Sequence, residues 1–462
     1  MKALLISGDR SGSGKTSITL ALAALLSREA SVQTYKVAMD YIDPSYLTAV
    51  TGRPCRNLDS YVMSPAQMQG VFEHGAEGAD LALVEGVRGL FEGAEATGDA
   101  GSTASVAKAL GLPVVLVVDA RSITRSAAAI VNGYAGFDPD VRVAGVILNN
   151  IRTEGHRDKT TRAIEHYCGL PVIGAVPKDE GMRLAMRHLG LVPYREGQEG
   201  DEFLARVEAI KEVVASYIDL DTLKGLMTEY TPQGRVREIF APVQEAPDLR
   251  VAVAYDEAFN FYYHDLFDLL GALGAEVVPF SPIHDSFPEA DGYILGGGYP
   301  ELYAEGLEKN LRMREGLCAA AGDGVPIYAE CGGLVYLTDR LTLRSGWQGR
   351  EHEEVYEMCG VLPGDAAIPG RRTLGYVEGR AGPACPFGDW GFRGHEFHYS
   401  EVDLAEGTTY AYRLSRGTGI AGRKDGAVRG QVLASYTHLH PVASAALYRG
   451  FVARCRERRN EP

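Results

Sequence analysis

Short apolar runs alternate with helix-like segments along the first 195 residues of the chain. The first run lies at residues 2–8 and ends in a glycine-rich loop, and a further run lies at residues 34–39. The runs at residues 81–86, 113–120, 143–149 and 171–177 are rich in Val, Ile and Leu and end in or before glycine or polar residues. The segment Thr16–Leu26 is rich in Ala and Leu at helical spacing. Apolar runs without alternation are typical of parallel strands buried on both faces, with helices as crossover connections. We therefore predict a doubly wound α/β domain over residues 1–195.

The pattern changes after this domain. Residues 196–247 are charged and mostly helical in pattern, and we predict a helical connector followed by a linker. A second alternation of strand and helix begins at Arg250, and the chain ends in a helix predicted from about Pro441. The second domain, also α/β, is therefore expected over residues 248–462.

Charge and length narrow the classes of function. The 462 residues are enough for two to three domains at about 150 residues each. Asp and Glu number 61 against 46 Lys and Arg, which gives a formal net charge of -15. Such a surface disfavours nucleic acid and anionic membrane as general partners.

Cysteine usage and the start of the chain indicate a cytoplasmic protein. The seven cysteines are scattered, odd in number and without a C-x-x-C pair, which disfavours a disulfide framework and a zinc ribbon. The opening MKALLISG lacks the layout of a signal peptide, and no stretch approaches the ~18 apolar residues of a membrane helix.

A glycine-rich loop follows the first predicted strand. It reads G-D-R-S-G-S-G-K-T, with its glycines at Gly8, Gly12 and Gly14. A loop of this kind between a strand and a helix binds phosphate, because backbone N–H groups and the helix dipole favour anions. Lys15 is then expected on the outer phosphates and the hydroxyl of Thr16 on Mg²⁺. The loop is one residue longer than the strict pattern, because the nearest upstream glycine is Gly8.

Further polar residues stand where strands of this domain should end. Asp40 and Asp43 follow one apolar run, and Glu85 ends another. Ligands of open α/β sheets bind at the carboxyl ends of strands, so these acids are candidate Mg²⁺ ligands, or else solvated acids. Asn149 ends a further run, where it would bind a purine edge or cap the next helix.

The second domain contains a candidate nucleophile. Cys331 lies between an apolar strand and an apolar helix and is followed by two glycines, which resembles a nucleophile elbow. A thiol at a helix N-terminus ionises more readily and needs a nearby base. His438 and His440 are the candidates, and their alternation along a presumed strand does not separate them. The loop of residues 296–301, GGGYPE, is a candidate oxyanion hole, or else a plain glycine turn.

A dense polar cluster lies at RGHEFHYSE, with Arg393, His395, Glu396 and His398. Three alternating polar residues do not make a tetrahedral metal site, and no cysteine of matching spacing is near. We therefore favour contact with substrate or between domains over zinc binding.

Taken in order, these motifs resemble the a,c-diamide synthases of tetrapyrrole biosynthesis, which act on cobyrinate or on nickel sirohydrochlorin. The resemblance covers nearly the whole chain and rests on ISGDRSGSGKTS, KVAMDYIDPSYLTAVTGRPCRNLDSYVM, VEGVRGLFEG, GSTASVAK, RSAAA, RHLGLVP, GGGYPELYA, AECGGLVYL, RGHEFHYSE and SYTHLH. The segment GDAGSTASVAKALGLPVVLVVDARSITRSAAA looks most like the methanogen branch. That likeness implies the nickel substrate, on the route to the nickel tetrapyrrole cofactor of methanogenesis.

The resemblance also implies an organisation and a set of partners. It implies an N-terminal ATP-dependent synthetase domain like dethiobiotin synthetase and a C-terminal domain like class I glutamine amidotransferases. The implied partners are ATP with Mg²⁺, L-glutamine and a carboxylated metallo-tetrapyrrole, and a homodimer is possible in this family. A polyanionic substrate needs local cations on an acidic protein. The candidates are Arg53, Arg88, Arg371 and Arg372.

Two roles in the amidotransferase domain follow from the resemblance. Cys331 falls on the family's nucleophile and His438 on its base, with His440 as the alternative. Many class I amidotransferases carry His-Pro-Glu, in which the Glu orients the base. Here Val442 follows Pro441, so the sequence predicts a base without that acid.

Overall fold

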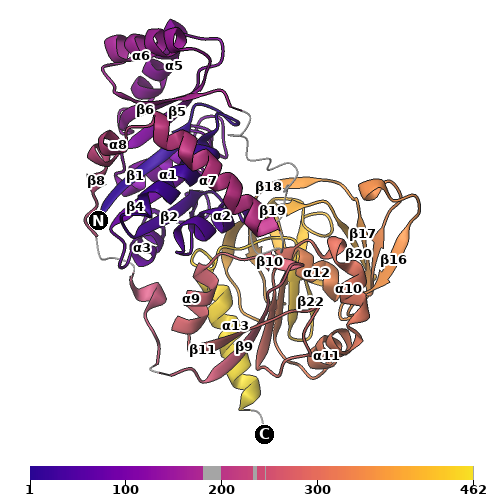
Figure 1. The fold of residues 1–462 in the computed structure, drawn as a ribbon. Helices are drawn as coiled ribbons and strands as arrows, with labels where there is room; N and C mark the ends of the chain where they lie inside the picture. The colour runs from indigo at the N-terminus through magenta and orange to yellow at the C-terminus, as the bar shows by residue number, and fades with distance from the viewer. Residues whose placement is uncertain (180–198, 233–236, 245, 461–462) are drawn as a thin grey trace. The chain divides into compact units, whose positions relative to one another are not determined.

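The computed structural model describes residues 1–179, 199–232, 237–244 and 246–460. The chain forms two compact units, Met1–Arg237 and Glu238–Pro462 (Figure 1). The motif RHLGLVP at residues 187–193 and the domain boundary expected at residue 195 lie outside the described residues.

The first unit is built on a parallel sheet. Among its described residues, seven strands run parallel in the order β3-β2-β4-β1-β5-β6-β7, and the short β8 pairs antiparallel with β1. The strands are β1 Lys2–Gly8, β2 Val32–Val37, β3 Arg56–Leu58, β4 Leu81–Gly89, β5 Val114–Asp119, β6 Val143–Ile151, β7 Val172–Pro177 and β8 Thr228–Glu229. The helices are α1 Lys15–Leu26, α2 Ile42–Thr51, α3 Pro65–Gly75, α4 Thr103–Leu110, α5 Arg125–Phe137, α6 Glu154–Cys168, α7 Glu199–Tyr217 and α8 Leu220–Leu226.

The doubly wound parallel sheet predicted from the apolar runs is confirmed. All six residues of β5 are buried, as are the residues of β1 that follow Lys2. Strands covered by helices on both faces need apolar side chains at every position, which is why the runs do not alternate.

Helix α7 differs from its expected role as part of a connector. Its apolar positions Phe203, Val207, Ile210 and Val214 recur at helical spacing and are buried in the core of the first unit. The helix packs against α1 and β7. An apolar stripe of this kind must be covered, so the segment folds onto the first unit.

The second unit contains a larger mixed sheet. Among the described residues it has nine strands in the order β11-β9-β12-β14-β23-β22-β21-β18-β19, of which the first five are parallel and the rest antiparallel. The strands are β9 Leu249–Ala254, β11 Ala275–Phe280, β12 Gly292–Leu295, β14 Ile327–Glu330, β18 Thr373–Ala381, β19 Gly391–His398, β21 Thr409–Arg416, β22 Lys424–Arg429 and β23 Val432–Ser435.

Smaller sheets and helices complete this unit. One sheet pairs β10 Phe259–Phe261 with β13 Gly297–Gly298, and another has the order β16 Glu354–Glu357, β15 Arg340–Leu343, β17 Gly364–Ile368 and β20 Glu401–Leu404. The helices are α9 Asp265–Ala272, α10 Ala304–Lys309, α11 Leu311–Gly322, α12 Gly332–Leu337 and α13 Ala445–Arg459, with short 3₁₀ turns η2 Arg237–Phe240, η3 Pro300–Leu302 and η4 Trp347–Gly349.

The strand presumed for SYTHLHP ends early. Strand β23 stops at Ser435, because the carboxylate of Asp425 accepts the N–H groups of Tyr436 and Thr437 at 3.0 and 2.9 Å. Beyond them, the backbone of His438 forms an isolated β-bridge with His395 and is not part of a strand. The final helix begins at Ala445, after the turn in which Ser444 N–H donates to His440 O at 2.9 Å, and not at Pro441.

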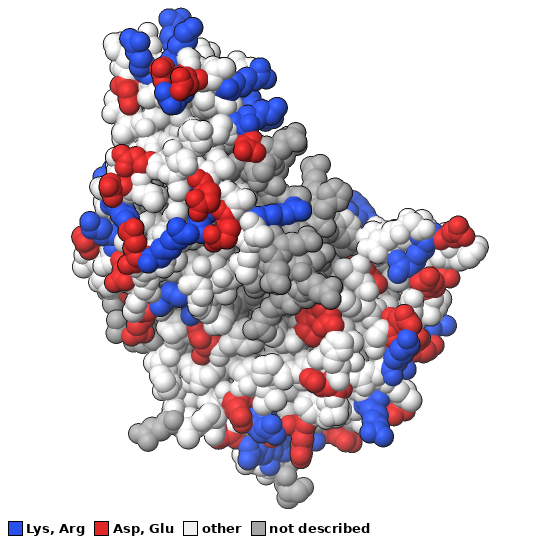
Figure 2. Space-filling view, in the orientation of Figure 1, with Lys and Arg blue, Asp and Glu red and all other residues white. Residues whose placement is uncertain are grey.

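Charges of both signs are interspersed over the face drawn in Figure 2. On that face Lys and Arg lie among Asp and Glu on each unit, although acids exceed bases in the whole chain. Within the residues that the structure describes, no helix combines the length and the apolar character needed to cross a membrane.

Candidate active sites in the two units

The glycine-rich loop connects β1 to α1, as its sequence predicts. Gly14 has φ of 89°, a conformation that favours glycine, and a Cβ there would lie 2.1 Å from Asn149 Nδ2. At Gly8 a Cβ would lie 2.4 Å from Ser13 Oγ, and Gly12 is also left-handed. Asn149 Nδ2 donates to Ser13 O at 2.8 Å. The amide of Asn149 therefore braces the loop. It does not cap the next helix, because the cap of α6 is Thr153, and its contact with a purine edge stays a prediction.

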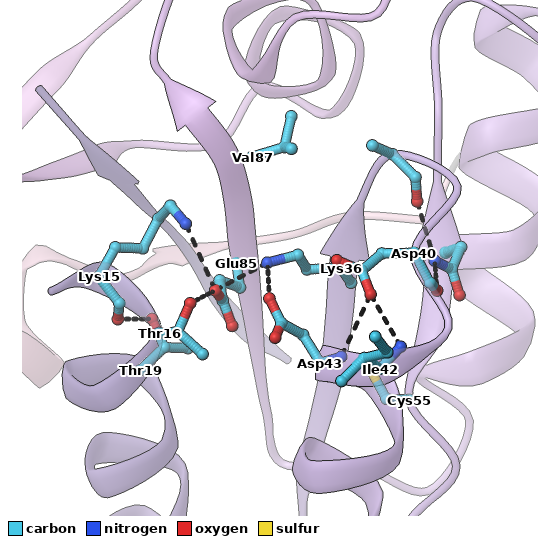
Figure 3. Close-up of polar contacts among 12 residues, drawn as sticks. Lys15, Thr16, Thr19, Lys36, Asp40, Ile42, Asp43, Cys55, Glu85 and Val87 are labelled. Carbon is cyan, nitrogen blue, oxygen red and sulfur yellow. Dashed lines mark hydrogen bonds and ion pairs between the residues drawn. The ribbon is translucent and has the colours of Figure 1, made fainter. Parts of the chain in front are cut away.

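Lys15 and Thr16 converge on Glu85, which lies midway along β4 (Figure 3). Thr16 Oγ1 donates to Glu85 Oε1 at 2.7 Å, and Lys15 Nζ lies 3.5 Å from the same oxygen. Burial and the neighbouring Lys36 lower the pKa of Lys15. Burial would raise the pKa of Glu85, but Lys36 and Lys15 bring it below its usual value. Glu85 is therefore an ionised acid that is held in its charged form by the two neighbouring lysines, Lys15 and Lys36.

A second lysine, Lys36 of β2, was not predicted as a site residue. Its ammonium lies between Asp43 and Glu85, with Nζ 2.8 Å from Glu85 Oε1 and in hydrogen-bond contact with Asp43 Oδ2 (Figure 3). Burial would lower the pKa of Lys36, but Asp43 and Glu85 raise it well above its usual value. The sequence signal for Lys36 is a lysine inside a run that is predicted to be a strand buried on both faces.

The two acids after β2 have different surroundings. Burial raises the pKa of Asp43 to about 6, although Lys36 opposes that change. Asp40 Oδ1 accepts the N–H groups of Ile42 and Asp43 at 2.8 and 3.2 Å, at the start of α2. Asp40 therefore shapes the turn that carries Asp43 to Lys36.

The residues expected to hold Mg²⁺ fit a site completed by phosphate and water. Glu85 Oε2 is buried and has no hydrogen-bond partner among the described residues, and Thr16 Oγ1 lies beside the same carboxylate. No group of three or more His, Cys, Asp or Glu side chains in the described parts of the chain is arranged to hold a metal ion. Mg²⁺ commonly takes one or two protein ligands together with substrate phosphates.

The arginines proposed for a polyanionic substrate divide into two kinds. The guanidinium of Arg53 already donates hydrogen bonds within the protein, to Gln33 Oε1 and to the backbone carbonyls of Gly75 and Glu77. Arg88 is exposed near the end of β4 with φ of 49°. Arg371 and Arg372 are also exposed, and Arg372 lies over the ring of Tyr399 at 5.7 Å.

In the second unit, Cys331 lies at a sharp turn between β14 and α12. Its φ of 46° and ψ of -96° are rare for a residue with a side chain. The N–H of Cys331 donates to Ser435 O at 2.7 Å, and Sγ lies 3.7 Å from Phe397 O. The strand on one side and two glycines on the other produce the elbow that the sequence pattern predicts.

His438 contacts both Cys331 and an acid. Its Nδ1 lies 3.3 Å from Glu330 Oε2, and the imidazole is fully buried. Burial would lower the pKa of His438, but hydrogen bonding to Cys331 and Glu330 raises it to about 10. The sequence predicted a base without an orienting acid, and this was wrong. The acid is Glu330, the residue immediately before the candidate nucleophile.

His440 lies in different surroundings. Its Nε2 is 3.5 Å from Asp265 Oδ2, and both side chains are fully buried. Its Nδ1 accepts the N–H of Val442 at 3.3 Å, and its ring packs on Tyr263 at 4.8 Å. His440 therefore contacts Asp265 at the start of α9, whereas His438 contacts Cys331.

A pocket opens beside Cys331. It is lined by Phe261, Gly298, Tyr299, Pro300, Glu301, Cys331, Gly332, Val335, Ile368, Phe397, His398, Tyr399 and Ser400. A Cβ on Gly332 would lie 3.1 Å from the backbone nitrogen of Gly298, so the GGGYPE loop packs against the elbow. That loop therefore brings backbone groups beside the thiol, where an oxyanion hole is needed.

The RGHEFHYSE cluster supports this site. His395 exchanges backbone hydrogen bonds with His438, and their rings meet edge to face at 4.9 Å. Glu396 accepts the N–H groups of residues 418 and 419, and His398 stacks on Tyr436 at 3.7 Å. Arg393 lies 3.7 Å from Glu378. His395 therefore holds the backbone of His438, and His398 lines the pocket beside Cys331.

Comparison with known families assigns the two units separately. Residues 4–192 match the CobQ/CobB/MinD/ParA nucleotide binding domain. Residues 250–446 match the CobB/CobQ-like glutamine amidotransferase domain. The first match covers the phosphate loop with Glu85 and the second covers Cys331 with His438.

Relatives align with nearly the whole chain. A protein named cobyrinate a,c-diamide synthase from Methanosarcina barkeri is 49% identical, with 97% of this chain and 94% of the relative covered. One of the same name from Methanosarcina acetivorans is 50% identical over 95% and 92%. Another, from Methanothermobacter thermautotrophicus, is 43% identical over 95% and 96%. The chain is thus a glutamine-hydrolysing, ATP-dependent amidating ligase and belongs to the cobyrinate a,c-diamide synthase family.

Proposed function

We propose that this enzyme amidates the a and c acetate side chains of nickel sirohydrochlorin, with ATP as the activating co-substrate and L-glutamine as the nitrogen donor. The observation that carries the proposal is the presence of two complementary sites in one chain. One is a phosphate loop at which Lys15 and Lys36 meet Glu85, and the other joins Cys331, His438 and Glu330.

In the first unit, the acetate carboxylate attacks the γ-phosphorus of ATP, and ADP leaves. Lys15 and Lys36 stabilise the charge on the transferred phosphoryl group, since Lys36 is a buried cation and Lys15 a half-buried one beside Glu85. Mg²⁺ held by Thr16 and Glu85, with Asp43 and Asp40 near, would neutralise phosphate charge. Ammonia then attacks the acyl phosphate, and the amide forms as inorganic phosphate leaves.

In the second unit, the Cys331 thiolate attacks the side-chain amide of glutamine. Backbone N–H groups of the GGGYPE loop and of Gly332 stabilise the oxyanion. His438 gives its proton to the leaving ammonia and later takes one from the water that hydrolyses the thioester. Glu330 holds the imidazole and favours its charged form. Each amide formed consumes one ATP, one glutamine and one water.

The choice of tetrapyrrole is supported by the segment containing GSTASVAK. This segment forms the start of α4, where Thr103 Oγ1 accepts the N–H of Val87 at 2.9 Å near the end of β4. Thr103, one of the methanogen-like residues, therefore contacts Val87, which lies two positions along β4 from Glu85, where a substrate carboxylate would meet ATP.

Cobyrinate is the alternative substrate, and the names of the relatives favour it. The two compounds present similar acetates and differ in ring methylation and metal, so the shape of the ring edge must discriminate them. The test gives the full chain each compound in parallel with ATP, Mg²⁺ and glutamine, and measures kcat/KM and product mass. We expect a higher kcat/KM for nickel sirohydrochlorin. A higher value for cobyrinate selects the alternative, and amidation of neither compound overturns both.

A further inference from the structure

Glu301 is a buried carboxylate in the pocket beside Cys331. It belongs to η3, which follows β13 after Tyr299 and packs against α12. Only 8% of Glu301 is exposed, yet it lines the same pocket as Cys331 and Gly332. The fold therefore places an acid in the pocket beside the candidate nucleophile.

The carboxylate of Glu301 has no cationic partner among the described residues. Burial raises its pKa to about 7, and only its own backbone N–H opposes that change. No Lys or Arg is among the described residues that line the pocket. Buried acids are ordinarily paired, because an isolated buried charge is costly, so this one is suited to a cation that arrives with a ligand.

A second acceptor lies in the same pocket. His398 Nδ1 lies 3.0 Å from Ser400 O, and burial lowers the pKa of His398 to about 4, so its ring is neutral at pH 7. With Nδ1 donating to that carbonyl, Nε2 is an acceptor. Nε2 is buried and has no hydrogen-bond partner in the described part of the chain. The pocket thus holds two unmatched acceptors, and an ammonium group would satisfy both.

We propose that Glu301, with His398 Nε2, is the subsite for the α-ammonium group of free L-glutamine. The proposal rests on the glutaminase half of the proposed function and adds the basis of its specificity. The reacting amide and the α-ammonium group stand at opposite ends of glutamine, so one end meets Cys331 while the other neutralises Glu301. An amide without the ammonium group leaves Glu301 unpaired in the pocket and binds less well.

The test compares two amides that differ in that group alone. Glutaramate has the chain and carboxylate of glutamine and lacks the α-ammonium. With the full-length wild-type chain we expect kcat/KM for L-glutamine to exceed that for glutaramate by about 100-fold. Glu301→Gln keeps the shape and removes the charge. It should lower kcat/KM for L-glutamine about 10- to 100-fold, mostly through KM, and change the value for glutaramate less than about threefold.

Two controls keep the result specific. Glu301→Asp keeps the charge and should retain part of the preference for L-glutamine. Amidation with added ammonia, which does not use this pocket, reports that each variant is folded. An equal loss for both amides in Glu301→Gln indicates a structural role and overturns the subsite, as does an unchanged preference. A wild-type chain that hydrolyses neither amide, yet amidates with ammonia, overturns the glutaminase function and the subsite with it.

Discussion

Glu330 Oε2 lies 3.3 Å from His438 Nδ1, a contact that joins the residue before the candidate nucleophile to the candidate base. The other carboxylate oxygen, Oε1, accepts the hydroxyl of Tyr328 at 2.5 Å and the N–H of Leu439 at 3.0 Å. Two donors therefore fix the carboxylate with one oxygen toward the imidazole. Strand β14 thus ends in the acid that contacts the candidate base, and the candidate nucleophile follows it directly, in place of the His-Pro-Glu arrangement.

The first prediction concerns Glu330→Gln. The variant keeps the contacts of Oε1 but loses the charge beside His438, so glutamine-dependent kcat should fall about 10- to 1,000-fold. Ammonia-dependent amidation should persist. Glu330→Asp should recover part of the activity, because it restores the charge.

The pH profile distinguishes this positioning role from a structural one. Glu330 helps to raise the pKa of His438 to about 10, and the protonated ring is the form that pairs with the thiolate. Removing the charge lowers that pKa, so the loss of glutaminase activity at alkaline pH should move to lower pH. A profile of kcat/KM against pH with an unchanged alkaline limb would contradict the assignment.

The second prediction concerns Cys331→Ser. A serine hydroxyl ionises far less than a thiol at neutral pH, so glutamine-dependent amidation should be almost entirely lost. ATP-dependent amidation with a high concentration of ammonia should continue, because that reaction bypasses the glutaminase. Both rates are measured on one preparation. Loss of the ammonia-dependent reaction in a folded variant would argue against a separate synthetase site.

The third prediction ranks the two histidines. Like Cys331→Ser, His438→Ala should lose glutamine-dependent amidation and keep ammonia-dependent amidation, since His438 contacts the thiol and Glu330. His440→Ala should reduce glutaminase activity less and lower the thermal midpoint more, because it leaves the fully buried Asp265 without its imidazole. Glutaminase assays and thermal unfolding of both variants provide the comparison. The opposite ranking of activities would move the base to His440.

The residues that sequence reasoning located are those fixed by local geometry. Lys15 and Thr16 follow a loop whose spacing is itself the signal, and Cys331 is marked by the strand before it and the glycines after it. Each of these signals lies within about ten residues. The strands of the first unit were predicted for the same reason, because burial on both faces leaves continuous apolar runs.

The residues that it missed depend on pairing across the fold. Lys36 becomes a site residue because β2 is paired with β4, which aligns it with Glu85. Glu330 faces His438 because β14 pairs with β23 and the carboxylate of Asp425 then holds the backbone that follows β23. Spacing along the chain carries no information on such pairs.

The fourth prediction concerns Lys15→Ala. The change removes a cation from the outer phosphates of ATP, so amidation should be abolished with either nitrogen source. Glutaminase activity belongs to the other unit and should survive at least in part. Product mass with glutamine and with ammonia, alongside glutamate release, measures the three activities. Full amidation by this variant would contradict the assignment of the phosphate loop.

The last prediction concerns the stability that Lys36 provides. Lys36 is 2% exposed and is shared by Asp43 and Glu85. Lys36→Met fills the same space without charge. Glu85 keeps Lys15 at 3.5 Å, but Asp43 loses the cation that it contacts. The first unit should therefore lose about 3–5 kcal/mol of unfolding free energy, along with amidation activity. Lys15→Met, which leaves Lys36 in place, should lose less stability and is the matched control.

The pH dependence of that loss follows from Asp43. Its folded pKa, about 6, already exceeds the unfolded value, and removing Lys36 raises it further. The folded state then binds a proton that the unfolded state releases, so stability falls as pH rises from the unfolded pKa to the folded one. Urea unfolding at pH 5.5 and pH 8 should show a larger deficit for Lys36→Met at pH 8. Adding Asp43→Asn should remove most of that dependence, because the amide does not titrate. An equal deficit at both pH values would mean that Lys36 does not hold Asp43 in its charged form.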